Sequence, residues 1–276
     1  MLRGLYTATA GMISLQRRHD TITNNIANIH TPGFKQGETV QRTFPEMLIS
    51  RIDQLNASAP GSNRRQAIGP LANGVLAEET VFNFAQGDIL ETGNPYHIAL
   101  WEDNGPLNPD RGQRPHAFFT GQTPDGIRYT RNGEWTVDVN NTLVTSEGFL
   151  VLDDAGQPIT ITDPNAFFVG TDGTVGLNGP DGIDVIAQLG IVSVDDVDLL
   201  VRQGNGVYEW TGDGELPPMD GNVELYQGYT ERSNVNLQQA TVDLMQVMRL
   251  YEANQRTIQA YDRSLEKAVN EVGRLG

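Results

Sequence analysis

Apolar residues recur at alternating intervals of three and four at both ends of the chain, which is the spacing of a helix that packs along another helix. Near the C-terminus, one strip consists of Leu237, Leu244, Tyr251, Ile258, Leu265 and Val272, and the second of Ala240, Val247, Asn254, Tyr261, Ala268 and Leu275. Residues 2–30 repeat the pattern in the strips Leu5, Met12, His19, Ile26 and Ala8, Leu15, Ile22, Ile29. We therefore predict a long helix at each end of the chain.

Two helices alone leave part of each apolar strip in water, so we expect them to pack on each other and on copies from neighbouring subunits. Gly4 and Gly11 share one face of the first helix, where small residues let another backbone come close. Asn254 is the polar break in its strip; it either fixes the register of the helices or faces solvent or a neighbour's backbone. The predicted assembly seam comprises Leu5, Met12, Leu15, Ile22, Ile26, Ile29, Leu237, Leu244, Val247, Tyr251, Asn254, Ile258, Tyr261 and Leu265.

Between the helices the pattern changes to short β-prone runs separated by Asp-Gly and Asn-Gly turns, such as Asn132-Gly133 and Asp172-Gly173. Residues 39–47 look extended, and residues 50–75, rich in Ser, Asn, Gly, Ala and Arg, look like a loop or exposed linker. The predicted fold is α+β: terminal helices in a coiled-coil-like core domain, and an intervening antiparallel β domain that is barrel- or sandwich-like. Its expected parts are residues 1–35 (N-terminal helix), 36–78 (extended or linker segment), 79–226 (β-rich outer domain) and 227–276 (C-terminal helix).

Charge is distributed unevenly along the 276 residues. The formal net charge of −16 combines +3 in residues 1–45, −19 in residues 46–226 and zero in residues 227–276. So acidic a middle argues against nucleic acid as a partner, because phosphates need a basic surface. No apolar run reaches the ~18 residues of a membrane-spanning helix, so we expect no membrane insertion. Arginine, glycine and threonine interrupt the N-terminal segment, from which we expect no cleaved signal peptide.

Candidate catalytic chemistry is sparse. The chain has no cysteine, and His19, His30, His97 and His116 lack metal-ligand spacing. There is no nucleophile elbow, phosphate-binding loop or dinucleotide fingerprint. The acidic clusters Asp153-Asp154 and Asp195-Asp196 lack the pattern of a calcium loop and favour a solvated surface. We therefore expect no catalytic residue, no cofactor and no metal.

Several motifs, taken in order, resemble the axial proteins of the bacterial flagellum, meaning the basal-body rod and hook proteins. The N-terminal motifs are Leu5-Tyr6-Thr7-Ala8, Asn24-Asn25-Ile26-Ala27-Asn28 and Thr31-Pro32-Gly33-Phe34-Lys35. The central ones are Gln86-Gly87, Thr92-Gly93-Asn94-Pro95 and Tyr129-Thr130-Arg131-Asn132-Gly133. Gln227-Gly228, Glu231, Ser233-Asn234-Val235-Asn236 and Tyr251-Glu252-Ala253-Asn254 complete the series. Residues 101–115 depart from the family pattern as a longer loop with three prolines.

The resemblance implies a non-enzymatic structural subunit that polymerises through its terminal helices into the hollow rod of the basal body. Its expected partners are itself, neighbouring rod and hook subunits, and the flagellar type III export apparatus. Its expected location is the basal body, outside the cytoplasm. The signature residues are Asn25, Asn28, Thr31, Pro32, Gly33, Phe34, Ser233, Asn234 and Val235. Three alternatives are a hook or hook-associated subunit, a peptidoglycan-acting enzyme with rod-like ends, and a module whose acidic β domain captures a basic partner.

Overall fold

The chain forms two compact units in the computed structural model, which describes residues 2–43, 47–53, 64–71, 74–102, 114–179, 182–204, 206–219 and 223–272. The first, the helical unit, comprises Met1–Ile26, Gly37–Phe82 and Leu237–Gly276. The second, the β unit, comprises Ala27–Gln36 and Asn83–Asn236. Each unit is therefore assembled from segments that are far apart in the sequence.

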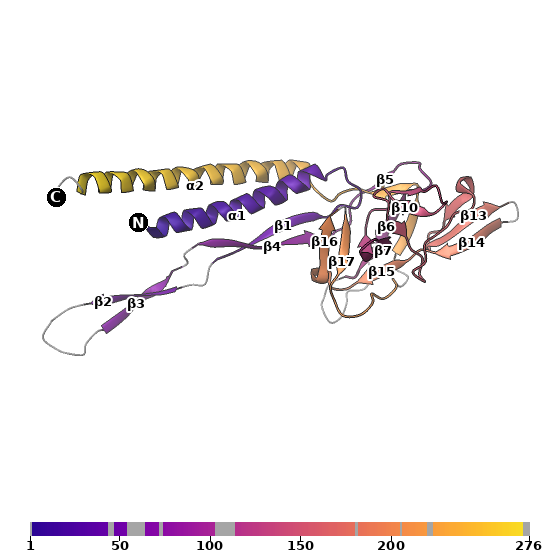
Figure 1. Cartoon of the computed structure of the whole chain (residues 1–276), viewed down its shortest axis with the longest axis horizontal. Coiled ribbons are helices and arrows are strands. Elements are labelled where there is room, and N and C mark those ends of the chain that lie inside the picture. The colour runs from indigo at the N-terminus through magenta and orange to yellow at the C-terminus, as the bar shows by residue number, and fades with distance from the viewer. Residues whose placement is uncertain are drawn as a thin grey trace. The chain divides into compact units, whose positions relative to one another are not determined.

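The helical unit contains one long helix from each end of the chain and a ribbon of strands (Figure 1). Helix α1 spans Leu2–Ala27 and helix α2 spans Leu237–Val272. Neither contains proline, and α1 ends before the Thr31-Pro32 step, where proline disfavours the helical conformation of the preceding residue. Strands β1 (Gln36–Thr43) and β4 (Val75–Asn83) pair with each other. Within this unit, α1 lies between α2 and the β1–β4 ribbon (Figure 1).

Polar side chains attach α1 to the ribbon. The Asn25 side chain donates to the Gly37 carbonyl at 2.7 Å and accepts from the Gly37 N–H at 3.0 Å. Thr39 Oγ1 donates to Thr21 Oγ1 at 2.8 Å, and Arg17 Nη1 donates to the Ala77 carbonyl at 2.8 Å. These bonds fix which face of α1 is turned toward the strands.

The segment expected to be a loop or exposed linker contains paired strands in its described part. Strand β2 (Met47–Asp53) pairs antiparallel with β3 (Arg64–Leu71), from the Met47–Leu71 pair to the Asp53–Arg64 pair. The composition of residues 50–75 obscured this pairing, because serine, asparagine and glycine are typical of loops.

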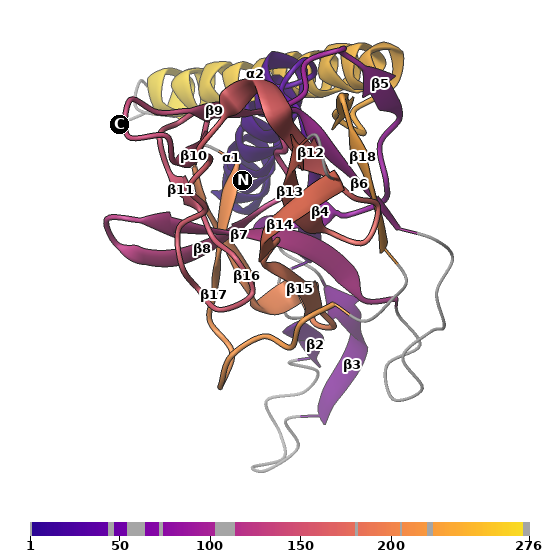
Figure 2. The same ribbon diagram turned by 90° about the vertical axis from the view of Figure 1, so that its right-hand side faces the viewer.

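Most strands of the β unit belong to one antiparallel sheet, with smaller sheets beside it (Figure 2). The eight-stranded sheet has the order β16 (Leu200–Gly204), β17 (Val207–Trp210), β8 (Gly126–Thr130), β7 (His116–Thr123), β11 (Leu150–Val151), β10 (Leu143–Thr145) and β9 (Trp135–Val137), with β15 (Ile191–Val194) also on β7. A three-stranded sheet joins β12 (Phe167–Val169), β13 (Thr174–Gly179) and β14 (Gly182–Gln188). Two separate two-stranded sheets complete the β unit. One pairs β18 (Val223–Gln227) with β6 (Ile98–Glu102), and the other pairs β19 (Tyr229–Glu231) with β5 (Ile89–Glu91). The short 3-10 helices are η1 (Pro164–Ala166) and η2 (Val197–Leu199).

Aromatic and aliphatic side chains from these sheets form one core. Trp135 is fully buried, and its ring meets that of Phe119 edge-on at 4.7 Å between centroids. The indole N–H donates to the Asn132 carbonyl at 3.2 Å, which satisfies its one polar atom. Ile98, Leu100 and Leu143 belong to the same cluster.

The fold prediction was wrong in two respects. The described strands form no closed barrel: β11 and β15 share one edge of β7, and the end strands β16 and β9 do not pair with each other. The helices also do not bury both heptad strips as a coiled coil would, since Leu237 and Tyr251 remain exposed. The reason is that α1 divides its contacts between α2 and the strands, so that the ribbon takes part of the place expected for partner helices.

Some predictions concern residues outside this description. Most of the expected loop at residues 101–115 lies outside the described residues, and so does Leu275, the last residue of the second C-terminal heptad strip. Neither described helix is long and apolar enough to cross a membrane.

Candidate functional site

The two terminal helices approach each other at the glycines of α1. A Cβ added at Gly4 would lie 2.2 Å from the hydroxyl oxygen of Tyr261, and one at Gly11 would lie 3.3 Å from Nδ2 of Asn254. Gly4 and Gly11 therefore leave the space that Tyr261 and Asn254 of α2 occupy. The polar break at Asn254 faces α1.

The predicted seam residues divide into an inner and an outer set. Leu15 and Ile22 of α1 and Val247 of α2 are buried, together with Ala8 and Ala240. The half-buried seam residues are Leu5, Met12, Ile26, Ile29, Leu244, Asn254, Ile258, Tyr261 and Leu265. Leu237 and Tyr251 are exposed, and Met248, which was not in the predicted seam, is exposed between Leu244 and Tyr251. Leu237, Leu244, Met248 and Tyr251, spaced by seven, four and three residues, form an apolar strip along one side of α2, which we call the outer strip.

The N-terminal signature residues form the turn by which the chain enters the β unit. Thr31 N–H donates to the Asn28 carbonyl at 3.1 Å, and Phe34 N–H donates to the Thr31 carbonyl at 3.3 Å. Gly33 has a φ of +67°, and its N–H donates to the Glu231 carbonyl at 2.8 Å. Half-buried Pro32 lies within this turn, which Gly33 completes because glycine adopts positive φ without steric cost.

The C-terminal signature residues form hydrogen bonds just before α2 begins. Asn234 Oδ1 accepts from the Gln36 N–H at 2.8 Å, and its Nδ2 donates to the Asn83 carbonyl at 2.7 Å. Ser233 Oγ accepts from the N–H of Val235, which is itself buried. One asparagine thus joins three segments of the β unit that are distant in sequence.

A buried ion cluster lies in the β unit where these motifs meet. Lys35 Nζ is 2.7 Å from Glu231 Oε1, and Arg131 Nε is 3.0 Å from Glu231 Oε2; each of the three side chains is 1% exposed. Arg131 also forms an ion pair with Glu102, whose other oxygen lies 3.1 Å from His116 Nδ1. We call these five residues the ion cluster.

Backbone groups form further hydrogen bonds with the charged side chains of the ion cluster. Lys35 Nζ donates to the Ala85 carbonyl at 3.0 Å, and the Gly87 N–H donates to Glu231 Oε1 at 2.8 Å. Arg131 Nη1 donates to the Ala117 carbonyl at 2.7 Å. Buried charges need both opposite charges and hydrogen bonds, and this cluster has both.

The same contacts shift the pKa values. Burial, reinforced by the charge of Arg131, lowers the pKa of Lys35 to about 8, although Glu231 opposes this shift. Burial raises the pKa of Glu102, but the hydrogen bond with His116 and the charge of Arg131 outweigh it and bring the pKa to about 2. Burial is likewise outweighed at Glu231, where Arg131 and Lys35 lower the pKa. Both carboxyl groups are thus held as carboxylates.

The sequence did not predict this cluster. Lys35, Arg131 and Glu231 stood in the recognised motifs, but their pairing was not foreseen, and Glu102 and His116 were not singled out together. A usable signal existed, because a charged residue beside a β-prone run in an otherwise apolar or small-residue motif indicates a buried partner. The acidic clusters that stand out in the sequence, Asp153-Asp154 and Asp195-Asp196, are instead exposed or half-buried.

Three family descriptions match separate parts of the chain. "Flagella basal body rod protein" matches residues 5–35, "Flagellar hook protein FlgE/F/G D1 domain" matches residues 115–177, and "Flagellar basal body rod FlgEFG protein C-terminal" matches residues 226–271.

Relatives align over nearly the whole chain. The chain is 39% identical over 279 residues to the flagellar hook-basal body complex protein FlhO of Bacillus subtilis, covering 100% of both chains. It is 30% identical to the flagellar basal-body rod protein FlgG of the same species, covering 98% of this chain and 99% of the relative. The chain belongs to the flagellar basal-body rod protein family. A 30% identity to the rod protein FlgF of Caulobacter vibrioides, covering 100% of this chain and 99% of the relative, agrees with this.

The resemblance inferred from the motifs is therefore confirmed. Each of the three matched regions contributes at least one residue to the ion cluster. Lys35 comes from the first, Arg131 and His116 from the second, and Glu231 from the third. The cluster thus joins all three regions by which the family is recognised.

Proposed function

We propose that this chain is a structural subunit of the flagellar basal-body rod that assembles with neighbouring subunits through its terminal helices. Its membership of the rod protein family supports this function. Assembly through the helices is supported mainly by the outer strip of α2, whose Leu237, Met248 and Tyr251 are 48%, 50% and 37% exposed. Tyr6 and Ile13 of α1 are exposed as well, at 70% and 51%.

An apolar strip of this kind has a clear energetic use in a polymer. Burying an apolar side chain fully stabilises an assembly by roughly 1.5–3 kcal/mol, before the cost of ordering is subtracted. Ala240 and Val247 of α2 are already buried, whereas the outer strip remains available for another helix. A neighbouring subunit offers such a helix, since every copy carries the same pair.

The remaining parts of the proposal concern location and partners. The subunit resides in the basal body outside the cytoplasm, and its partners are other copies of itself and adjacent rod and hook subunits. It reaches this place through the flagellar type III export apparatus, and the polymer is the hollow shaft that turns the filament. Neither catalysis nor nucleic acid enters this function.

Matched substitutions on α2 test the assembly surface. Met248→Asp places a charge on the outer strip, and Gln246→Asp places the same charge about 160° around the helix. In cells that carry only the variant chain, we expect Met248→Asp to abolish motility and Gln246→Asp to preserve it, with both proteins exported and equally helical by circular dichroism. Full motility with Met248→Asp would overturn the proposed surface.

A hook or hook-associated position is the second candidate. It is favoured by the match of residues 115–177 to the hook protein D1 domain description and by the printed name of the FlhO relative. Antibody labelling of purified hook-basal bodies separates the two, because a rod subunit is retained in particles from which the hook has been removed.

A further inference from the structure

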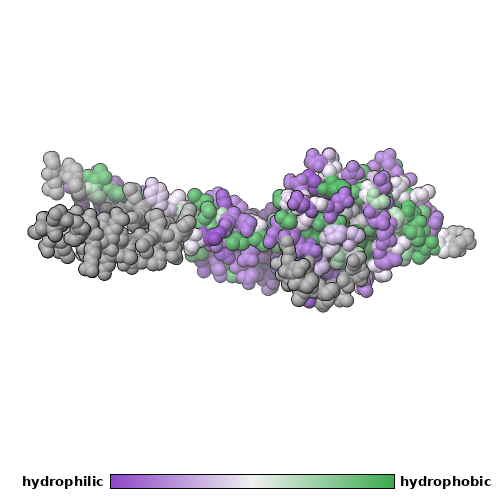
Figure 3. All heavy atoms as spheres, turned by 90° about the horizontal axis from the view of Figure 1, so that it is seen from below, coloured by the Kyte–Doolittle hydropathy of each residue, from purple (hydrophilic) through white to green (hydrophobic). Residues whose placement is uncertain are grey.

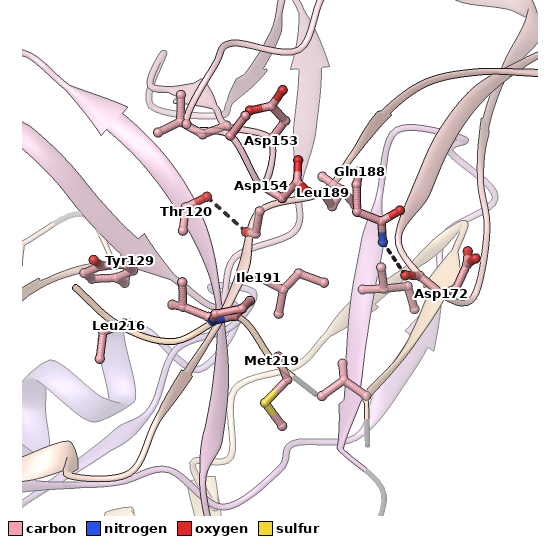
Figure 4. Close-up of a pocket in the computed structure, with 18 of the residues that line it drawn as sticks. Thr120, Tyr129, Asp153, Asp154, Asp172, Gln188, Leu189, Ile191, Leu216 and Met219 are labelled. Carbon is pink, nitrogen blue, oxygen red and sulfur yellow. Dashed lines mark hydrogen bonds between the residues drawn. The ribbon is translucent and has the colours of Figure 1, made fainter. Parts of the chain in front are cut away.

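The β unit contains a pocket that lies outside the assembly surface proposed above. Its volume is about 900 Å³, and its walls come from the segment after β11, the β12–β13 turn, the β14–β15 connection, residues 215–219 and β18. In Figure 4, Asp153 and Asp154 lie on one side of the pocket, Asp172 on another, and Ile191 between them. Pockets of ~300–1,000 Å³ accommodate ligands of drug size, so a few residues of a peptide fit here.

Apolar side chains line the interior. Leu152, Leu189 and Leu225 are buried beneath it, and Ile191 and Met219 are half-buried. Ile191 and Met219 therefore offer apolar surface to a ligand in the pocket, above the buried leucines. An apolar side chain would gain from being placed against this surface, because water is removed from both.

Carboxylates surround this apolar interior, and no lysine, arginine or histidine is among the described residues that line it. Five acidic residues line the pocket: Asp153, Asp154, Asp172, Glu215 and Glu224. Three already accept hydrogen bonds: Asp153 from the Gln157 N–H, Asp172 from the Thr174 N–H and Glu224 from the Tyr226 hydroxyl. A carboxylate has about four lone-pair sites, so each of them can accept more.

Basic residues are scarce in the sequence around these carboxylates. Residues 132–231 contain 18 acidic residues and a single basic one, Arg202, whose guanidinium lies over the ring of Phe34 at 4.3 Å. Arg128 is also engaged, since it pairs with Glu209 at 3.2 Å. Hydrophilic residues cover much of the face of the β unit seen in Figure 3. The sequence that supplies most of the pocket wall therefore carries a large excess of negative charge, which favours a cationic ligand.

We propose that this pocket is a docking site for a segment of a partner protein in which an apolar side chain is flanked by arginine or lysine. The apolar side chain contacts Ile191, Leu216 and Met219, and the cations pair with the carboxylates at the edge. Charge complementarity excludes an acidic ligand such as nucleic acid. A metal ion is a poor occupant, because the described residues contain no group of three or more His, Asp or Glu side chains placed to hold one.

The test uses the purified full chain and a short synthetic peptide of alternating arginine and leucine. Peptides of alternating arginine and serine and of alternating glutamate and leucine are the controls. We expect the arginine–leucine peptide to shift the backbone amide resonances of Thr120, Gly190 and Ile191, with an affinity that falls as salt is added. The two control peptides should bind more weakly, because each lacks one half of the recognition.

Matched triple variants make the result specific to the pocket. Asp153→Asn, Asp154→Asn and Asp172→Asn together should weaken binding about tenfold, since each partly exposed ion pair contributes about a factor of two. Asp195→Asn, Asp196→Asn and Asp198→Asn remove the same charge outside the pocket and should leave the affinity nearly unchanged. Absence of saturable binding, or equal weakening by both triple variants, would overturn the proposal.

Discussion

Lys35 Nζ lies 2.7 Å from Glu231 Oε1, although 196 residues separate the two in the sequence. The pair joins the turn after the N-terminal helix to the strand before the C-terminal helix. Arg131 holds the other carboxylate oxygen of Glu231, so the middle of the chain is attached at the same point. The β unit is thereby closed by a cluster of charges contributed from its beginning, middle and end.

Removing Glu231 should destabilise the β unit strongly. Glu231→Gln leaves Lys35 and Arg131 buried without that negative charge, which costs about 3–5 kcal/mol. Tryptophan fluorescence during urea unfolding measures this, because Trp101, Trp135 and Trp210 all lie in the β unit. Glu147→Gln makes the same charge change at an exposed position and should cost less than about 0.5 kcal/mol. Equal losses of stability in the two variants would mean that the ion cluster contributes no more to stability than an exposed carboxylate does.

Acid should destabilise the β unit through Glu102. Its pKa is lowered from 4.5 to about 2 because the hydrogen bond with His116 and the charge of Arg131 outweigh burial. The stabilisation from this group is therefore fully present above about pH 4.5 and disappears as the pH falls through 2. It amounts to about 3 kcal/mol, by linkage from the difference in pKa.

Urea unfolding at a series of pH values between those two pKa values measures the effect. The Glu102→Gln variant should be less stable than the unmodified chain at neutral pH and should lose less stability on acidification. Part of the pH dependence should remain in the variant, because the pKa of Glu231 is also lowered. Parallel pH dependences in the variant and the unmodified chain would show that Glu102 is not responsible.

Gly33 should tolerate no side chain. A Cβ there would lie 2.5 Å from the Arg131 carbonyl carbon and 2.6 Å from the Asn132 nitrogen, at a φ of +67°. Gly33→Ala should therefore cost about 2–5 kcal/mol, combining the left-handed conformation with overpacking. Gly93→Ala has a similar φ of +70° with nothing within 4 Å, so it should cost only the conformational part, about 1–2 kcal/mol. The same fluorescence assay compares them, and identical losses would contradict the close approach.

The helices were predictable because their pattern is long and uninterrupted. The heptad strips identified both. Gly4 and Gly11 do lie on the face of α1 that α2 approaches, but the close atoms belong to the side chains of Tyr261 and Asn254 and not, as was predicted, to another backbone. The coiled-coil interpretation failed because a heptad pattern records which side of a helix is apolar, and not what covers it. Hydrogen bonds such as Asn25 to Gly37, which bring strands against α1, have no periodic signal.

The antiparallel character of the β unit could also be predicted, whereas its topology could not. Turn dipeptides such as Asn132-Gly133 mark where strands end, but they do not say which strands pair. The pairing of β7 with both β15 and β11 along one edge depends on contacts between distant residues. The ion cluster was missed for the same reason, since Lys35, Arg131 and Glu231 meet only in three dimensions.

The central claim is that neighbouring subunits cover the outer strip of α2 in the rod. The reactivity of a single engineered thiol tests this claim most directly. The chain has no cysteine, so Met248→Cys carries the only thiol. The rate of maleimide labelling is measured on the purified monomer, on isolated basal bodies, and on the same particles after denaturation. We predict rapid labelling in the monomer, strong protection in the basal body and complete labelling after denaturation. Equal rates in monomer and basal body, or absence of the chain from the particles, would contradict the account.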